Sequence, residues 1–243
     1  MTQNTPWITL ALTTLLLATV ACSEEDAGEG TLTAVVYGEE FIEDGITAED
    51  MADNWEVTFS SFVVDIQDVT VGSVALPSSE PIDISVGTDG NGHELSSTTA
   101  SAQAYTDASY VIAQMKVTGT ATKDGVTKTF DWEFDHDTHY SDCHIDTTLT
   151  EGGTEVFQVT VHADHLFYDS LVAEEPQVVF QALADADLDE DGEITRAELE
   201  MTDIGSYDPG SAGDVSTMWE WLVAQSSTVG HGNGEGHFGA HSH

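Results

Sequence analysis

One short acidic segment constrains the local fold more tightly than any other part of the chain. Carboxylates alternate at Asp187, Asp189 and Asp191, and Glu198 closes the segment. Gly192 follows the third aspartate, at the point where such a loop must turn sharply with a positive φ angle. That conformation costs a residue with a Cβ about 1 to 2 kcal/mol, so glycine suits the turn. The spacing predicts a loop that surrounds a hard cation with oxygen atoms.

The segment resembles the calcium-binding loop of the EF-hand family. Six positions of the loop would supply the calcium ligands: Asp187, Asp189, Asp191, Glu193, Thr195 and Glu198. Four of these bind through carboxylates, the residue after the glycine binds through its backbone carbonyl, and the threonine stands where water often intervenes. The flanking sequence predicts an entering helix from Pro176 to Ala184 and a short exiting helix from Arg196 to Met201.

EF-hand loops usually occur in pairs, and the segment Asp208–Glu220 is the nearest candidate for a second loop. Gly210 and Ala212 stand where carboxylates belong, and Trp219 stands at the closing position. We therefore predict a single calcium site, whose role is structural rather than sensory.

The N-terminus predicts export. Trp7 to Ala21 form an apolar run that is too short to span a bilayer as a mature helix, and Cys22 follows directly. Residues 1–21 resemble a bacterial lipoprotein signal peptide, which implies a lipid anchor on Cys22. Residues 22–30 then form an acidic tether. Ser23 resembles the second residue of lipoproteins that are sent to the outer membrane. An ordinary secretory signal is the alternative, and both signals export the protein.

Charge excludes two classes of partner. The chain has 45 acidic residues against three lysines and one arginine, and its formal net charge is -41. A chain of this charge has no general electrostatic attraction for nucleic acid or for anionic lipid headgroups. Solubility at high ionic strength explains the acidity, because 1 M salt shortens electrostatic repulsion to a range of about 3 Å.

Histidines suggest a second metal ion. If Cys22 carries lipid, Cys143 is the one remaining thiol and the chain cannot form an internal disulfide. Six side chains in two segments are candidate ligands for zinc or copper: His136, His139, Cys143, His144, His162 and His165. Histidines three residues apart in a strand point to opposite faces, so each pair needs a bend to converge. The alternative is that these are surface or structural histidines.

The C-terminal tail, residues 230–243, is rich in glycine and histidine. Four histidines lie in this tail: His231, His237, His241 and His243. Such a composition captures soft divalent ions without a fixed fold, and a flexible chain end is the alternative.

The remaining pattern predicts a β-rich α+β fold, a β-sandwich with a C-terminal helical EF-hand appendage. We expect a β-rich domain over 31–174 and a helical region over 175–229, with a final helix from Val215 to Val223 whose tryptophans are packing anchors. Valine, isoleucine, threonine and aromatic residues with partial period-two alternation predict six strands, at 32–37, 55–71, 81–86, 110–122, 126–134 and 156–161. Lys123, Asp124 and Gly125 predict a hairpin turn.

Enzyme signatures are missing from the sequence. His93 and Glu94 begin a zinc-protease pattern, but position 97 is serine, and neither a G-x-S-x-G motif nor a phosphate-binding glycine loop occurs. We therefore expect no catalysis. Two hypotheses remain: a lipid-anchored protein whose calcium ion stabilises an interaction domain, or a zinc- or copper-handling lipoprotein. A hydrolase that uses a histidine-bound zinc ion is a third possibility, and the sequence identifies no protein partner.

Overall fold

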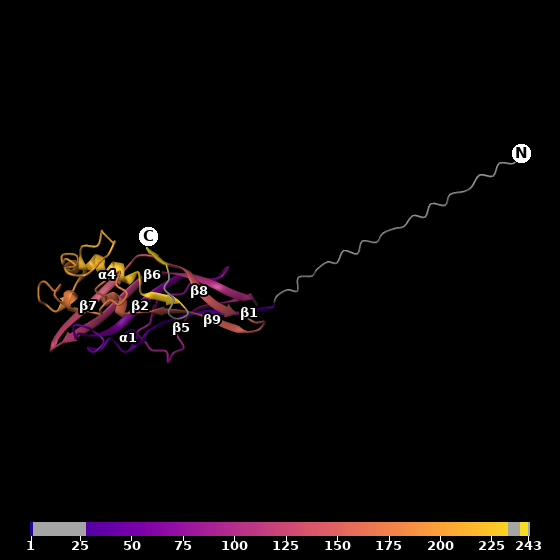
Figure 1. Cartoon of the computed structure of the whole chain (residues 1–243). Coiled ribbons are helices and arrows are strands. Elements are labelled where there is room, and N and C mark those ends of the chain that lie inside the picture. Colours follow the sequence, from indigo (N-terminus) through magenta and orange to yellow (C-terminus); the bar gives the residue numbers. More distant parts are fainter. Residues whose placement is uncertain (2–27, 233–238, 243) are drawn as a thin grey trace.

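The computed structural model of the chain describes residues 1, 28–232 and 239–242 (Figure 1). The predicted signal peptide apart from Met1, the lipidation site Cys22, and the tail residues His237 and His243 lie outside the described residues. Within the described part of the chain, no helix is both long and apolar enough to cross a membrane. The last residues assigned to the tether, Glu29 and Gly30, already belong to the first strand.

The fold is β-rich α+β, as predicted, and its strands form two sheets. The smaller sheet has the strand order β11-β9-β1-β5. Its strands have the bounds β1 Glu29–Gly38, β5 His93–Ser101, β9 Thr154–Val161 and β11 Gly230–Gly232. β1 and β9 run parallel, whereas the outer strands pair antiparallel. This sheet therefore brings together residues 29–38, 154–161 and 230–232, which are far apart in the sequence.

The larger sheet is built around the long strand β6. β2 pairs with one edge of β6, while β7 and β8 share the other edge, and shorter strands extend the sheet. The bounds are β2 Glu56–Val71, β3 Val74–Ala75, β4 Ile82–Asp83, β6 Ala104–Lys123, β7 Val126–Phe134, β8 Thr138–Thr148, β10 Glu193–Ile194 and β12 Gly239–Ser242. The predicted hairpin turn is confirmed, because Asp124 and Gly125 have φ angles of 50° and 84° between paired Lys123 and Val126.

Both sheets and the helical region contribute to one hydrophobic core. Tyr110 of β6 and Phe157 of β9 link the two sheets, with ring centroids 6.3 Å apart. The predicted packing role of the tryptophans is confirmed, because Trp219 stacks on Phe134 of β7 and Trp221 is fully buried. Figure 1 shows the helical region, in orange and yellow, beside β7 at one end of the molecule, whereas β1 begins near the other end.

The helices are short. Their bounds are α1 Glu40–Glu43, the 3-10 helix η1 Asp164–Phe167, α2 Gln181–Ala184, α3 Arg196–Leu199 and α4 Met218–Ser226. The final helix begins three residues later than predicted, because Thr217 caps it. The Thr217 hydroxyl accepts a hydrogen bond from the backbone N–H of Glu220, and the Glu220 side chain accepts one from that of Thr217. The predicted exiting helix is α3, which ends at Leu199 rather than at Met201.

The predicted entering helix over 176–184 is wrong in its first half, because α2 begins only at Gln181. Residues 178 and 179 instead form backbone hydrogen bonds with residues 52 and 167. Asp53 then caps α2 from a distant segment, since its Oδ2 accepts the N–H groups of Phe180 and Gln181 at 2.6 and 2.7 Å. These tertiary hydrogen bonds override the local apolar pattern.

Candidate functional site

The acidic loop, residues 187–198, begins after α2 and ends within α3. Its backbone adopts the sharp turn that the sequence predicts, with a φ angle of 93° at Gly192 and 63° at Glu190. A Cβ added to Gly192 would meet only the Thr127 backbone oxygen, at 3.6 Å, so backbone conformation rather than space explains the glycine.

The three aspartates of the acidic loop converge. Asp187, Asp189 and Asp191 each offer a carboxylate oxygen, and these atoms all lie within 4.8 Å of one another. Backbone N–H groups orient them, because Asp189 Oδ1 accepts from Asp191 N at 3.2 Å and Asp191 Oδ1 accepts from Glu193 N at 2.8 Å. Asp187 Oδ2 accepts from Gly192 N at 2.9 Å. The loop's own backbone therefore holds the carboxylates together.

One buried carboxylate oxygen of the acidic loop has no hydrogen-bond partner. Asp187 is only 6% exposed, and its Oδ1 is buried without a donor. A buried carboxylate oxygen without a partner is costly, so its presence calls for a ligand. The first position of an EF-hand loop is where calcium takes such an oxygen.

Glu198 closes the acidic loop. Its Oε1 accepts from Leu188 N at 2.8 Å, and its Oε2 accepts from the backbone N–H and the hydroxyl of Thr195 at 2.9 and 2.7 Å. Burial acts to raise the pKa of Glu198, but these donors outweigh burial and lower the pKa below its ordinary value. The bond from the Thr195 N–H is also one half of the capping box that begins α3; the other half is the Glu198 N–H, which donates to the Thr195 hydroxyl oxygen at 3.3 Å. Glu198 is therefore a carboxylate at neutral pH.

Lys128 of β7 forms an ion pair with Asp187 Oδ2. The side chain of Lys128 is 17% exposed and that of Asp187 is fully buried. The Lys128 ammonium group holds the pKa of Asp187 below its ordinary value, and the Gly192 N–H contributes further. Because the lysine engages Oδ2, it leaves the buried Oδ1 available to an ion.

The acidic loop docks on the edge of the larger sheet. Glu193 and Ile194 form β10, which pairs parallel with Thr129 and Phe130 of β7. Trp132 Nε1 donates to Ile194 O at 2.9 Å, and the Ile194 side chain is fully buried. β7 thus gives the acidic loop a short β contact, so the loop is part of the sheet structure.

The segment Asp208–Glu220 does not form a second acidic loop. Among the described residues, the groups of three or more potential metal ligands include none from this segment. Thr217 and Glu220 instead cap α4. The number of calcium sites stays a prediction.

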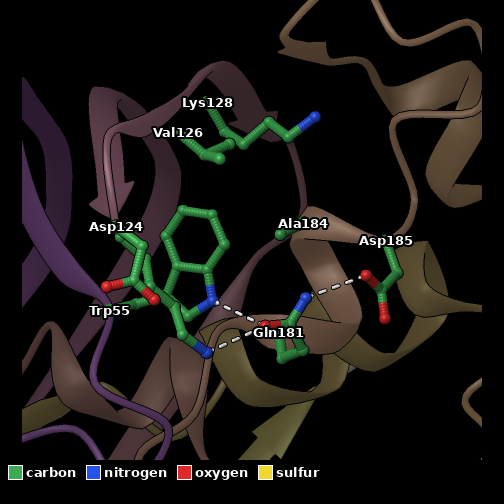
Figure 2. Close-up of a pocket in the computed structure, with 8 residues that line it drawn as sticks. Trp55, Asp124, Val126, Lys128, Gln181, Ala184 and Asp185 are labelled. Carbon is green, nitrogen blue, oxygen red and sulfur yellow. Dashed lines mark hydrogen bonds between the residues drawn. The ribbon is translucent and has the colours of Figure 1, made fainter.

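A pocket of about 330 Å³ lies beside the acidic loop (Figure 2). Gln181 is at its centre, where its Oε1 accepts from Trp55 Nε1 and from Lys123 Nζ, each at 3.1 Å. Gln181 Nε2 donates to Asp185 Oδ1 at 2.8 Å. Figure 2 shows the ammonium group of Lys128 directed away from Trp55 and Gln181. These polar groups satisfy one another, and they connect α2 to Trp55, the residue before β2, and to Lys123, the last residue of β6.

The structure brings only some of the predicted histidines together. His162, Asp164 and His165 offer ligand atoms that lie within 4.8 Å of one another. His231 of β11 lies against them, with ring centroids 4.2 Å from His162 and 5.4 Å from His165. We call these four residues the histidine cluster. Burial lowers the pKa of His165, so that its imidazole is neutral at neutral pH.

The other four candidate zinc or copper ligands lie elsewhere. His136 contacts the hydroxyl groups of Ser227 and Ser226 at 3.2 and 3.3 Å, and burial lowers its pKa. The remaining three lie on β8: His139, which pairs with His241 of β12, Cys143, which is buried in the core, and His144, which is exposed. None of the four belongs to a group of three or more potential ligands within the described residues.

Sequence reasoning missed two members of the histidine cluster. Asp164 stands between the two predicted histidines, and this H-x-D-H spacing was the available signal. His231 was assigned to a separate tail, and no local pattern relates it to residue 162. Its position follows from the pairing of β11 with β9, in which His231 is opposite Thr160.

Comparison with known proteins adds no relative, since no family model, curated protein or solved structure matches the chain.

Proposed function

We propose that this protein binds one calcium ion in the acidic loop and that the ion has a structural role. The observation that carries the proposal is the buried Oδ1 of Asp187, which has no hydrogen-bond partner beside the converging carboxylates of Asp189 and Asp191. The closing residue, Glu198, lies at the spacing that calcium loops require.

Electrostatics support a divalent ion at this position. The four carboxylates proposed as ligands, those of Asp187, Asp189, Asp191 and Glu198, carry four negative charges, and the Lys128 ammonium group paired with Asp187 offsets one of them. A calcium ion offsets two of these and stabilises the folded chain by mass action. Because β10 pairs with β7, stabilising the loop also holds α2 and α3 against the larger sheet.

The proposed setting is the cell envelope, with Cys22 lipidated after cleavage of residues 1–21. Calcium is plentiful outside the cytoplasm, where EF-type modules work with dissociation constants of roughly 10⁻⁴ to 10⁻³ M. The loop is then permanently loaded. Mass spectrometry of the envelope-associated protein tests this setting: we expect a diacylglyceryl group on Cys22, and we expect Cys22→Ala to release the protein from membranes. An unmodified N-terminus elsewhere in the chain supports the ordinary secretory signal instead.

Thermal unfolding of the full chain with and without calcium tests the proposal. At a calcium concentration of 100 times the dissociation constant, we expect stabilisation of about 2.7 kcal/mol. Asp187→Asn and Glu198→Gln should abolish most of it, because each removes a charged ligand while preserving shape.

Glu174→Gln is the matched control, since Glu174 is exposed and lies outside the acidic loop. It should keep the full calcium response. Unfolding curves of the wild-type chain that coincide with and without calcium would contradict the proposal.

A further inference from the structure

We propose that the histidine cluster is a second, independent metal site, which binds one zinc-class divalent ion through His162, Asp164, His165 and His231. The proposal does not depend on calcium binding by the acidic loop. It also differs from the sequence hypothesis, because it uses Asp164 and His231 and omits Cys143.

Three elements of the smaller sheet and its border place these side chains together. His162 follows the last residue of β9, and Asp164 and His165 begin η1. His231 is the middle residue of β11, which pairs with β9. The backbone N–H of His162 also donates to the carbonyl of Val229, just before β11, at 2.9 Å. The bend between β9 and η1 is what lets two histidines three residues apart converge.

Neighbouring groups fix the tautomers of His162 and His165. His162 Nδ1 lies 2.7 Å from Glu39 Oε2, and an ionised carboxylate only accepts, so this nitrogen carries the proton. His165 Nδ1 lies 3.1 Å from the hydroxyl oxygen of Thr228. That hydroxyl already donates its proton to the carbonyl of Gln225 at 2.8 Å, so it accepts from His165. In its neutral form, each of these two imidazoles therefore presents an Nε2 lone pair.

This arrangement is typical of metal-binding histidines, which donate their second ring nitrogen to a carboxylate or another oxygen. Glu39 plays that part for His162, and Thr228 plays it for His165. The oxygen ligand is prepared in a similar way: Tyr168 donates its hydroxyl to Asp164 Oδ2 at 2.6 Å, while Asp164 Oδ1 is buried without a hydrogen-bond partner. An oriented carboxylate with one unsatisfied oxygen is a second, independent indication of a cation.

The donor set selects the class of ion. Three imidazoles and one carboxylate suit zinc, which takes four nitrogen, sulfur or oxygen ligands in tetrahedral geometry. Calcium prefers oxygen ligands alone, so the acidic loop and the histidine cluster select different ions. Two carboxylates, Asp164 and Glu39, balance the two charges of the ion while the imidazoles are neutral. Four ligands from the protein close the site, so its role is to fasten β11 to β9 and η1.

Cobalt and zinc binding to the full chain, made without a histidine tag and purified without chelators, test the proposal. We expect one equivalent of cobalt with the visible bands of a four-coordinate ion and no thiolate-to-cobalt charge-transfer band. In zinc competition against a chromophoric chelator, His162→Gln and His165→Gln should each weaken binding by more than about 100-fold. Glu39→Gln should weaken it by about 10- to 100-fold, as is usual for a group that orients a ligand.

Three control variants separate the histidine cluster from the other candidate sites. His144→Gln alters an exposed histidine on β8 and should leave zinc affinity unchanged. Glu198→Gln alters the acidic loop and should also leave it unchanged, so that failure of the calcium proposal is distinguishable from failure of this one. A triple variant of His237, His241 and His243 to glutamine should keep zinc, and loss of zinc there would assign the ion to the tail.

A second measurement covers variants that fail to fold. On the wild-type chain, zinc should slow the modification of His162, His165 and His231 by diethyl pyrocarbonate, read by peptide mass spectrometry, and should not slow that of His144. Equal modification with and without zinc overturns the proposal. A cobalt–thiolate band, or unchanged zinc affinity in His162→Gln and His165→Gln, also overturns it.

Discussion

The acidic loop and the histidine cluster differ in how far apart along the chain their members lie. The loop draws its carboxylates from 187–198, and its own backbone N–H groups orient them. The cluster and its orienting carboxylate come from residues 39, 162–165 and 231, which meet because β9 pairs with β1 on one side and with β11 on the other. A site of the first kind is encoded by spacing, whereas a site of the second kind is encoded by topology.

The two sites also differ in what supports them. A lysine from the larger sheet already offsets part of the charge in the acidic loop, because Lys128 pairs with Asp187. The histidine cluster relies on Glu39 and Thr228 for the orientation of two of its imidazoles. Substitutions in the larger sheet should therefore change calcium binding and leave zinc binding unchanged.

The largest effect is expected for Lys128→Met. Removing the ammonium group leaves the buried Asp187 carboxylate uncompensated and should lower the calcium-free unfolding free energy by about 2 kcal/mol. This loss is smaller than the roughly 3 to 5 kcal/mol that is lost when one partner of a fully buried ion pair is removed, because Lys128 is partly exposed. Saturating calcium should recover much of the loss, since the ion supplies positive charge. Urea unfolding with and without calcium measures both values, and zinc affinity should not change.

Lys116→Met is the matched control for that variant. Lys116 pairs with Asp131 at 3.4 Å, but both side chains are about half exposed, and such surface pairs contribute only about 0 to 1 kcal/mol. A loss for Lys116→Met as large as that for Lys128→Met would mean that general charge, rather than the acidic loop, governs the effect.

An intermediate effect is expected for Gly192→Ala. The φ angle of 93° should cost about 1 to 2 kcal/mol for a residue with a Cβ and should weaken calcium binding. Gly90→Ala is the control, because Gly90 also has a positive φ angle, 77°, and a Cβ there meets nothing within 4 Å. Calorimetric titration should show weaker calcium binding for Gly192→Ala alone. Equal calcium affinities in the two variants would mean that backbone strain at Gly192 does not weaken calcium binding.

The smallest effect concerns Asp83, which lies in β4 and belongs to neither site. Burial acts to raise its pKa, but hydrogen bonds from Phe62, Ser85 and Ser61 outweigh burial and lower the pKa below the ordinary 3.8. A lowered pKa contributes stability above the ordinary value, and that stability is lost as pH falls through the folded value. Asp83→Asn should therefore be less stable than wild type at pH 7, with the difference shrinking below about pH 4. Urea unfolding across pH should show the same pH dependence of this stability difference with and without calcium. A stability difference between Asp83→Asn and wild type that grows in acid would contradict the lowered pKa of Asp83.

The sequence predicted best those elements that need no distant partner. β7 has the predicted bounds, 126–134, because its apolar residues alternate and the turn before it contains Asp124 and Gly125. The acidic loop was predicted for the same reason, since its spacing is self-contained. Whether its ligands bind calcium remains a prediction.

Elements that depend on distant partners escaped prediction. β5 and β8 are rich in serine, threonine, histidine and aspartate, and they become strands because β1 and β6 offer them hydrogen bonds. The predicted strand over 81–86 shortens to Ile82–Asp83. In the tail, Gly230–Gly232 and Gly239–Ser242 pair with β9 and β8, which composition alone did not indicate.

The parallel pairing of β1 with β9 has a consequence for the order in which the molecule is assembled. Residues 29–38 cannot form their parallel pairing before residues 154–161 have been synthesised. β9 gains its other neighbouring strand only after residues 230–232 have been synthesised. Contacts between such distant segments form slowly, on the scale of milliseconds to seconds in sheet-dominated domains. The smaller sheet therefore cannot be completed until nearly all of the chain has been synthesised. A chain threaded outward from its N-terminus would thus finish folding at its destination, where the ions we propose for it are at hand.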